Sequence, residues 1–251
     1  MIIAQISDTH IDLNHHNSAQ RLRDMERVVT AINALDPGPE VVIHTGDMAH
    51  NGTAEKYEAA LDVLKNLSVP LYAAAGNRDD RTLIRANFLT GRNLMSGMDF
   101  LQYEVDDYPV RLIALDTVSR ESNMGDYCEK RAQSLACALN ASADKPCALF
   151  MHHPPFEVRE SRYRWQYVSH EAVERLSDVI GGHNHLVGLF CGHSHRQSSG
   201  TIAGVSVGTV PSVAIDLRLG DFPKAAEAAP VFHLHHYRPD AGFETELHIA
   251  T

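Results

Sequence analysis

Short apolar runs alternate along this chain with segments in which apolar residues recur every three or four positions. The runs predict buried strands and the recurring pattern predicts helices; in residues 21–35, for example, Leu22, Met25 and Val29 fall on one face. Alternating strands and helices predict βαβ units with a parallel core, and therefore an α/β fold class. We expect strands at 2–7, 41–44, 69–75, 100–105, 110–115, 147–151, 186–190, 205–207, 231–236 and 244–249, and helices at 21–35, 53–65, 83–89, 129–140 and 169–180.

Chain length bounds the domain organisation. The 251 residues, 44% of them hydrophobic, are enough to bury one core, so we expect a single domain over residues 1–251. Two irregular segments, near 82–99 and 156–169, are candidates for a small cap or lid. The second interleaves three arginines with aromatic residues. That pattern is typical either of a solvated loop whose aromatic residues pack on the body or of a lid that contacts a phosphate ester.

Charge and the absence of targeting signals bear on partners and location. The net charge of −10 argues against a general nucleic-acid-binding protein, because such a protein presents a basic face. The start of the chain is too short and too uncharged for a signal peptide, and no apolar run has the length of a membrane span. The four cysteines lack CxxC spacing and predict neither a disulfide framework nor a zinc ribbon. We therefore expect a cytoplasmic protein without membrane contacts.

Potential metal ligands follow five of the expected strands. Taken singly, each group has a simpler explanation, such as an aspartate that caps a turn or a His-x-His pair on the surface. Ligands of open α/β sheets gather beyond the carboxyl ends of the strands, so the groups together predict one site. They are Asp8-Thr9-His10, Gly46-Asp47, Gly76-Asn77, His152-His153-Pro154-Pro155 and Gly192-His193-Ser194-His195.

The order D-x-H, G-D, G-N, H-H-P-P, G-H-x-H resembles that of the calcineurin-like metallophosphoesterase superfamily, and the resemblance extends from residue 4 to about 210. Within the superfamily, the opening motif at 5–10 and the His-His-Pro-Pro element look most like class III cyclic-nucleotide phosphodiesterases and related bacterial glycerophosphodiesterases. The resemblance implies a four-layer αββα sandwich with two mixed β-sheets, a small cap, and metals at one edge.

The resemblance also implies a ligand set for two metal ions. Carboxylate, imidazole and amide ligands without thiolates suit Mn²⁺, Fe²⁺, Co²⁺ or Zn²⁺. Two such ions can bind a bridging hydroxide for in-line attack on a phosphoryl group. The His-x-Pro spacing of relatives favours His152 as a ligand, with His153 as a neighbouring residue of the catalytic site. The implied sets are Asp8, His10 and His195 for one ion and Asn77, His152 and His193 for the other, with Asp47 between them.

One position departs from the family pattern. The usual element is Gly-Asn-His, with the histidine placed to contact the phosphate or protonate the leaving oxygen, and here that position is Arg78. Arginine stays protonated near neutral pH, so it cannot act as a general acid, but its fork of donors can bind a phosphoryl group. We expect Arg78 to be a phosphate clamp, with leaving-group protonation passing to water, to Asp79 or to nothing. The alternative is that Arg78 pairs with Asp79 or Asp80 and points away.

These inferences favour an enzyme that hydrolyses small phosphodiesters, either 3′,5′-cyclic nucleotides or glycerophosphodiesters. Alternatives are a phosphomonoesterase or protein phosphatase of the same superfamily, a non-catalytic binding protein with the same fold, and a nuclease. The segment 231–236 is apolar and rich in histidine, which allows a homo-oligomer. Its histidines alternate in a strand far from any turn signal, so we interpret His233, His235 and His236 as structural or subunit-facing rather than as ligands.

Overall fold

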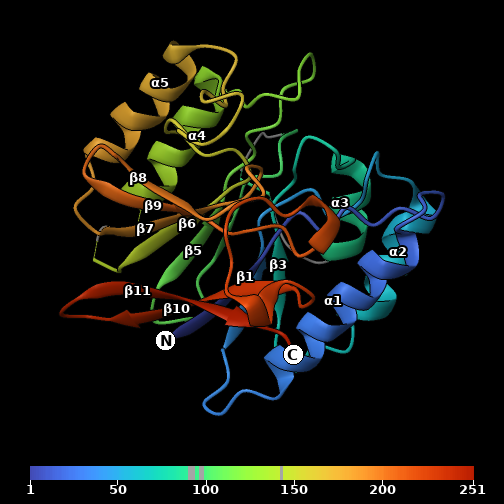
Figure 1. The fold of residues 1–251 in the computed structure, drawn as a ribbon. Coiled ribbons are helices and arrows are strands. Elements are labelled where there is room, and N and C mark those ends of the chain that lie inside the picture. Colours follow the sequence, from blue (N-terminus) through green and yellow to red (C-terminus); the bar gives the residue numbers. More distant parts are fainter. Residues whose placement is uncertain (90–93, 96–98, 142–143) are drawn as a thin grey trace.

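The computed structural model describes residues 1–89, 94–95, 99–141 and 144–251, and within these residues the chain forms two β-sheets and five α-helices (Figure 1). The strands are β1 (Ile2–Ile6), β2 (Val41–His44), β3 (Leu71–Ala73), β4 (Tyr103–Val105), β5 (Arg111–Ala114), β6 (Cys147–Phe150), β7 (Leu186–Cys191), β8 (Ser198–Ile202), β9 (Val205–Thr209), β10 (Val231–Arg238) and β11 (Gly242–Ile249). The helices are α1 (Ser18–Asn33), α2 (Ala54–Leu64), α3 (Arg81–Phe88), α4 (Glu129–Asn140) and α5 (His170–Gly181), with short 3-10 helices at Ile215–Leu217 and Lys224–Ala226.

Both sheets are mixed. The first has the order β11-β10-β1-β2-β3, in which β1, β2 and β3 are parallel and β10 pairs antiparallel with both of its neighbours. The second has the order β4-β5-β6-β7-β9-β8, in which β5, β6, β7 and β9 are parallel and the edge strands β4 and β8 are antiparallel. Each sheet therefore contains a parallel core whose strands end at a common edge.

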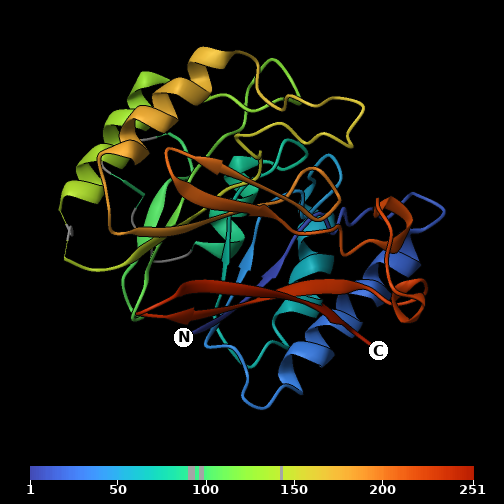
Figure 2. The same ribbon diagram turned by 60° about the vertical axis from the view of Figure 1, so that its left-hand side comes forward.

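Helices cover the outer faces of the two sheets (Figures 1 and 2). Helices α1, α2 and α3 lie beside the first sheet, and α4 and α5 lie together beside the second. Met25 and Ile32 of α1 belong to a buried apolar cluster with the first sheet, whereas Leu135 of α4 and Leu176 of α5 belong to a cluster with the second. The resulting four layers confirm the αββα sandwich expected from the resemblance.

One strand was not expected from the sequence. Residues 198–202 contain serine, glycine and threonine and form no apolar run, yet β8 pairs there with β9 in an antiparallel hairpin. A strand at the edge of a sheet needs little burial, so its sequence carries a weak signal. The expected strands at 100–105 and 110–115 do form an antiparallel pair, as β4 and β5.

The two segments considered as a cap differ in how far the structure describes them. In 82–99, α3 covers the first part, and residues 90–93 and 96–98 lie outside the described residues. The segment 156–169 contains no helix or named strand, and its three arginines are exposed. Two of its aromatic residues make contacts, since Trp165 stacks on His170 with ring centroids 4.3 Å apart and buried Tyr167 donates to the carbonyl of His153 at 3.2 Å. Tyr163, in contrast, is exposed. A lid function for this segment stays a prediction.

All four cysteines are free thiols in this fold. Within the ranges that the structure describes, no helix combines the length and the apolar character needed to cross a membrane.

Candidate metal centre

The loops that follow β1, β2, β3, β6 and β7 meet at one edge of the sandwich, where the parallel strands of both sheets end. The first three strands belong to one sheet and the last two to the other, so the site spans the interface between the sheets. These loops bring together all seven candidate ligands, of which four are buried and three half-buried: Asp8, His10, Asp47, Asn77, His152, His193 and His195.

One group of candidate ligand atoms comes from the loops after β1 and β7. The Nε2 atoms of His10 and His195 lie 3.1 Å apart, and His195 Nε2 lies 3.3 Å from Asp8 Oδ1. His195 Nδ1 lies 3.1 Å from the carbonyl oxygen of Leu217, which can only accept a hydrogen bond. Nδ1 therefore carries the proton in the neutral ring, and the lone pair of Nε2 points at His10 and Asp8. The three atoms are arranged so that one cation could contact all of them.

A second group comes from the loops after β3, β6 and β7. His152 Nε2 lies 3.1 Å from both Asn77 Oδ1 and His193 Nδ1. His152 donates through Nδ1 to the carbonyl of Thr45 at 2.8 Å, which leaves the Nε2 lone pair free in the neutral ring. Asp47 Oδ2 lies 3.5 Å from the Nε2 atom of His10 and 3.5 Å from that of His152. The Asp47 carboxylate is thus placed between the two groups.

The backbone around the site is strained. A positive φ is uncommon for a residue with a side chain, and such residues cluster at functional sites. Five of the seven candidate ligands have one: Asp8 (54°), His10 (43°), Asp47 (53°), His193 (67°) and His195 (55°).

Two of the glycines in the motifs are required by close packing. A Cβ atom on Gly76 would overlap the backbone nitrogen of Asp47, and one on Gly192 would overlap the Ser7 hydroxyl and lie 2.8 Å from Asp8 Oδ2. The Gly-Asn and Gly-His motifs therefore let one loop approach the carboxylate of another.

The charges of the site are arranged for a cation. Burial disfavours the charged carboxylates, but the neighbouring rings of His195 and His152 outweigh it and hold the pKa values of Asp8 and Asp47 well below their usual range. Burial lowers the pKa of His10 to about 4 and that of His193 to about 3. At His152 and His195 the neighbouring carboxylates outweigh burial, Asp47 raising the pKa of His152 to about 9 and Asp8 raising that of His195. Ionised carboxylates and neutral imidazoles are the forms that coordinate metals, so a cation bound here would displace the protons of these two rings.

One buried atom gives a further test of the fit to a metal. Asp8 Oδ1 is buried without a hydrogen-bond partner, although an unpaired buried carboxylate oxygen is costly. It faces His195 Nε2 and His10 Nε2, which lie 3.3 and 3.8 Å away. A divalent cation between these atoms would neutralise the carboxylate, so the donor set fits a metal.

His153 lies behind the second group. Its Nδ1 lies 2.9 Å from the Thr117 hydroxyl and its Nε2 lies 3.1 Å from the Asn123 carbonyl oxygen, so both ring nitrogens have protein partners. The His153 ring also packs on His193, with ring centroids 4.4 Å apart. A nitrogen of His153 is close enough to His152 and His193 to share an ion with them, but these hydrogen bonds favour a positioning role for His153.

Arg78 lies at the rim of the site. Its backbone N–H donates to Asp47 Oδ1 at 2.7 Å, and its guanidinium contacts the Asn51 side chain at 3.5 Å. Among the described residues, the partners of Asp79 are backbone N–H groups and the Tyr57 hydroxyl, and Asp80 accepts from the backbone of Leu83. Arg78 lines the same cavity as five of the seven candidate ligands. Its role as a phosphate clamp stays a prediction.

Asp79 does not line this cavity. Its carboxylate accepts hydrogen bonds from the backbone of Met48, Ala49 and Gly76 and from the Tyr57 hydroxyl, at 2.8 to 3.2 Å. Burial, together with the nearby Asp47 charge, raises the pKa of Asp79 to about 6. These contacts tie the loops after β2 and β3 together and occupy both oxygens of the Asp79 carboxylate.

The cavity over the candidate ligands has a volume of about 280 Å³ and includes residues that the sequence analysis did not single out. His50 contacts His10, with their Nδ1 atoms 3.4 Å apart. Arg21 donates to the carbonyl of His10 at 3.0 Å and pairs with Asp216 at 2.8 Å. His50 could have been found from its place three residues after Asp47. Arg21 lies in an expected helix, and nothing in its sequence position indicates a role in the site.

Comparison with known proteins places the chain in a family. A family model described as calcineurin-like phosphoesterase matches residues 1–197. The chain is 32% identical over 252 residues to an Arcobacter nitrofigilis protein named "Probable glycerophosphodiester phosphodiesterase GpdQ", an alignment that covers 98% of this chain and 92% of that protein. A Rhodopseudomonas palustris protein named "Probable cyclic nucleotide phosphodiesterase" is 31% identical over 218 residues, with coverage of 84% and 78%. The chain belongs to the calcineurin-like metallophosphoesterase family.

Solved structures agree with this assignment at the level of the fold. A dimetal phosphatase from Danio rerio superposes with a TM-score of 0.73 and 14% identity, covering 100% of this chain and 99% of that one. At this identity the likeness concerns the architecture alone. Fold, family and the buried cluster of histidine and aspartate side chains together define a metallophosphoesterase with a candidate dimetal site.

Proposed function

We propose that this protein hydrolyses small phosphodiesters with two divalent metal ions. The observation that carries the proposal is the position of Asp47, whose Oδ2 atom lies 3.5 Å from one histidine of each ligand group. Asp8, His10 and His195 would hold one ion, and Asn77, His152 and His193 the other. Oxygen and nitrogen donors without thiolates suit Mn²⁺, Fe²⁺, Co²⁺ or Zn²⁺. When bound, two such ions supply Lewis acidity and an activated water for attack at phosphorus.

The protein's own residues bind and orient the ester. Arg78 at the rim offers guanidinium donors to the phosphoryl oxygens and neutralises the charge that develops on them. The backbone N–H of Arg78 holds Asp47 in place, so the same residue couples the bridging carboxylate to the substrate. Thr45 and Leu217 orient His152 and His195 through their carbonyl groups.

Several features support a small diester as substrate. The cavity of about 280 Å³ matches a compact ester, and the net charge of −10 opposes long nucleic acids. The relatives at 31–32% identity carry names that refer to glycerophosphodiesters and cyclic nucleotides. A phosphomonoesterase is the alternative at the same site. A non-catalytic binding protein is disfavoured because all seven candidate ligand positions hold suitable residues.

The test compares bis(p-nitrophenyl) phosphate with p-nitrophenyl phosphate, using protein stripped of metal and then reloaded with Mn²⁺. We expect metal-dependent turnover that is faster on the diester. Asp47→Asn should abolish it, whereas Asp62→Asn, the same change at an exposed position of α2, should not. A preference for the monoester would indicate a phosphatase, and no metal-dependent turnover of either ester would contradict the proposal. Glycerophosphodiesters and 3′,5′-cyclic nucleotides can then be compared as natural substrates.

A further inference from the structure

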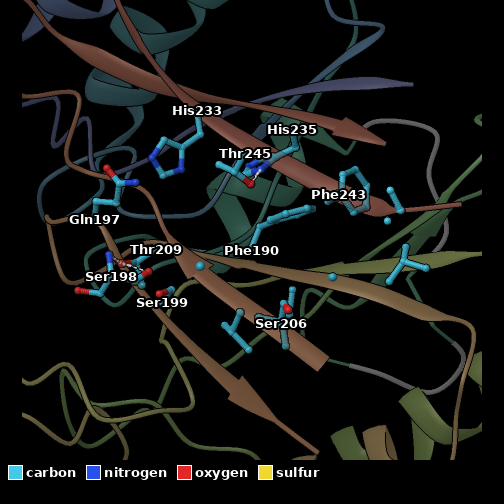
Figure 3. A pocket seen from close by; sticks show the side chains of 17 residues that line it. Phe190, Gln197, Ser198, Ser199, Ser206, Thr209, His233, His235, Phe243 and Thr245 are labelled. Carbon is cyan, nitrogen blue, oxygen red and sulfur yellow. Dashed lines mark hydrogen bonds between the residues drawn. The ribbon is translucent and has the colours of Figure 1, made fainter. Parts of the chain in front are cut away.

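A second cavity lies between the two sheets, away from the metal centre. It has a volume of about 410 Å³ and opens between the β10–β11 hairpin of one sheet and strands β7, β8 and β9 of the other (Figure 3). None of its lining residues belongs to the cavity over the candidate metal ligands. Its volume falls within the range of roughly 300–1,000 Å³ that is typical of small-molecule sites.

The face of β9 that lines this cavity is small and polar. Val205 and Val207 pack into the buried cluster on the helix side of the second sheet, so the alternate residues Ser206 and Gly208 face the first sheet. A Cβ atom added to Gly208 would have no atom within 4 Å. Facing sheets usually fill the space between them with apolar side chains, and here that space is left open.

Aromatic rings from both sheets line the cavity beside this face. Phe190 of β7 stacks on His235 of β10, with ring centroids 4.0 Å apart and an interplanar angle of 26°. Phe243 of β11 packs edge-on against Phe190 at 5.1 Å. In Figure 3, His233 and His235 project from β10 toward the strands that carry Phe190 and the serines. Because Phe190 and His235 stack on each other and are buried, the half-buried Phe243 ring is the aromatic surface here on which a flat ring can stack.

Hydrogen bonds indicate which ring nitrogen of His235 carries the proton. The Gln5 amide nitrogen donates to Cys191 and Thr45, so its Oε1 atom faces His235 Nε2 at 2.9 Å and accepts from it. His235 Nδ1 then accepts from the Thr245 hydroxyl at 2.8 Å. Burial lowers the pKa of His235 well below its usual value, so the ring is neutral and the Thr245 oxygen keeps its lone pairs for a further donor.

His233 has unused hydrogen-bonding capacity. Its side chain is buried and lines the same cavity, and within the described residues its Nε2 atom has no hydrogen-bond partner. Burial lowers the pKa of His233 to about 4, so this ring is also neutral near pH 7. The Gln197 amide, which can both donate and accept, lines the cavity beside it (Figure 3). Among the 17 lining residues there is no aspartate, glutamate, lysine or arginine.

We propose that this cavity binds an uncharged heteroaromatic molecule of the nucleoside type. A flat base can stack on the Phe243 ring, and its edge can bond to Gln197 and Thr245. A bond to the buried Nε2 atom of His233 requires that ring to turn toward the cavity. A polyol would leave the Phe243 ring unused, and a fatty acid or phosphate would find no cation in the cavity. The proposal does not depend on the phosphodiesterase activity, because it concerns a site without metal ligands.

The test measures adenosine binding to the metal-free full chain by isothermal titration calorimetry, with AMP and glycerol as comparison ligands. We expect saturable one-to-one binding of adenosine, with AMP weaker by about tenfold or more because the cavity offers its phosphate no cation. A ligand held at the metal centre would show the reverse order and would require added metal. No saturable binding of adenosine, or AMP that binds as tightly, would overturn the proposal.

Two variants locate the binding. Gly208→Leu fills the open space without steric conflict at Cβ and should weaken adenosine binding by about tenfold or more. Thr201→Leu adds the same side chain at an exposed position of the β8–β9 hairpin outside the cavity and should have no effect. His233→Phe keeps an aromatic ring at this position and costs the fold no hydrogen bond, because His233 Nε2 has no partner. This variant should also weaken adenosine binding. Unchanged binding in both Gly208→Leu and His233→Phe would overturn the proposal.

Discussion

The Nδ1 atoms of His50 and His10 lie 3.4 Å apart, and the other ring nitrogen of His10 faces Asp8, Asp47 and His195. A histidine that coordinates a metal through Nε2 carries its proton on Nδ1 and donates it to a neighbour, which fixes the plane of the ring. His50 is placed to be that acceptor. Its position in the loop after β2 links the orientation of His10 to the loop that holds Asp47.

His50→Ala should therefore weaken metal binding by roughly 10- to 100-fold, the usual effect of losing a hydrogen-bond partner of a metal ligand. Mn²⁺ affinity measured by calorimetry is the readout, so the result does not depend on activity. His50→Asn, which keeps an acceptor near the same place, should recover much of the affinity, and His16→Ala at an exposed position is the control. Equal affinities in His50→Ala and the unmodified protein would contradict this role.

The two adjacent histidines after β6 should behave differently. His152 Nε2 converges with Asn77 and His193, whereas both nitrogens of His153 have protein partners. His152→Ala should reduce the metal content from about two ions to one. His153→Ala should keep both ions and lower the catalytic rate, because His193 loses the ring that packs against it. Metal content by atomic emission after dialysis distinguishes the two, and loss of an ion only in His153→Ala would reverse the assignment.

Arg78 should determine how the rate depends on the leaving group. With an arginine in the position where the family usually has histidine, no imidazole from that loop can protonate the leaving oxygen. We expect Asp79 not to replace it, because both oxygens of its carboxylate already accept hydrogen bonds from backbone N–H groups and Tyr57. Poor leaving groups should therefore react slowly relative to nitrophenolate.

Arg78→His should raise the rate on an alkyl ester relative to the rate on bis(p-nitrophenyl) phosphate, by about tenfold or more. Arg78→Lys keeps the positive charge and should leave this ratio unchanged while it raises KM, because the fork of donors is lost. If the ratio of alkyl-ester rate to bis(p-nitrophenyl) phosphate rate were unchanged in Arg78→His, the residue at position 78 would have no effect on protonation of the leaving oxygen.

The sequence was most informative where strands end in polar motifs. Asp8, Asp47, Asn77, His152 and His193 each follow a short apolar run, and parallel strands necessarily bring such ends to one edge. The alternating strands and helices established the α/β class, but the pairing of strands from distant parts of the chain into two facing sheets came only from the resemblance.

Other features could not be read from local sequence. β8 carries no apolar run, and His50 and Arg21 enter the site through contacts across the fold. The cavity between the sheets exists because Gly208 and Ser206 of β9 face β10, and only the sheet-to-sheet register reveals that arrangement. The sequence of 231–236 indicates histidines that are structural or subunit-facing. In the structure, His233 and His235 line this cavity, and His236 pairs with Glu246 at 3.0 Å. A homo-oligomer and a cytoplasmic location stay predictions.

His233 should make the metal-free protein less stable in mild acid. Its pKa falls from an ordinary 6.5 to about 4 on folding because the ring is buried. Between these values the unfolded chain holds a proton on this residue that the folded chain does not, so the free energy of unfolding decreases as the pH falls from about 6.5 toward 4. Above about pH 6.5 neither state holds this proton, so only the roughly 1.5 pH units from there to pH 5 contribute. At about 1.4 kcal/mol per unit, the decrease attributable to His233 between pH 7.5 and 5 is about 2 kcal/mol.

His233→Phe removes this titration and fills the same space with a ring that needs no hydrogen bond. The free energies of unfolding of His233→Phe and the unmodified protein, measured with urea on metal-free samples, should therefore diverge by about 2 kcal/mol as the pH is lowered from 7.5 to 5. The other buried histidines titrate in both proteins, and among them the neighbouring His235, whose pKa His233 helps to lower, also responds to the substitution. Parallel stability curves would mean that His233 takes up its proton in the folded state as readily as in the unfolded chain. The ring would then have to contact water or an acceptor in the cavity. That contact would contradict the structure, in which the Nε2 atom of His233 is buried without a hydrogen-bond partner.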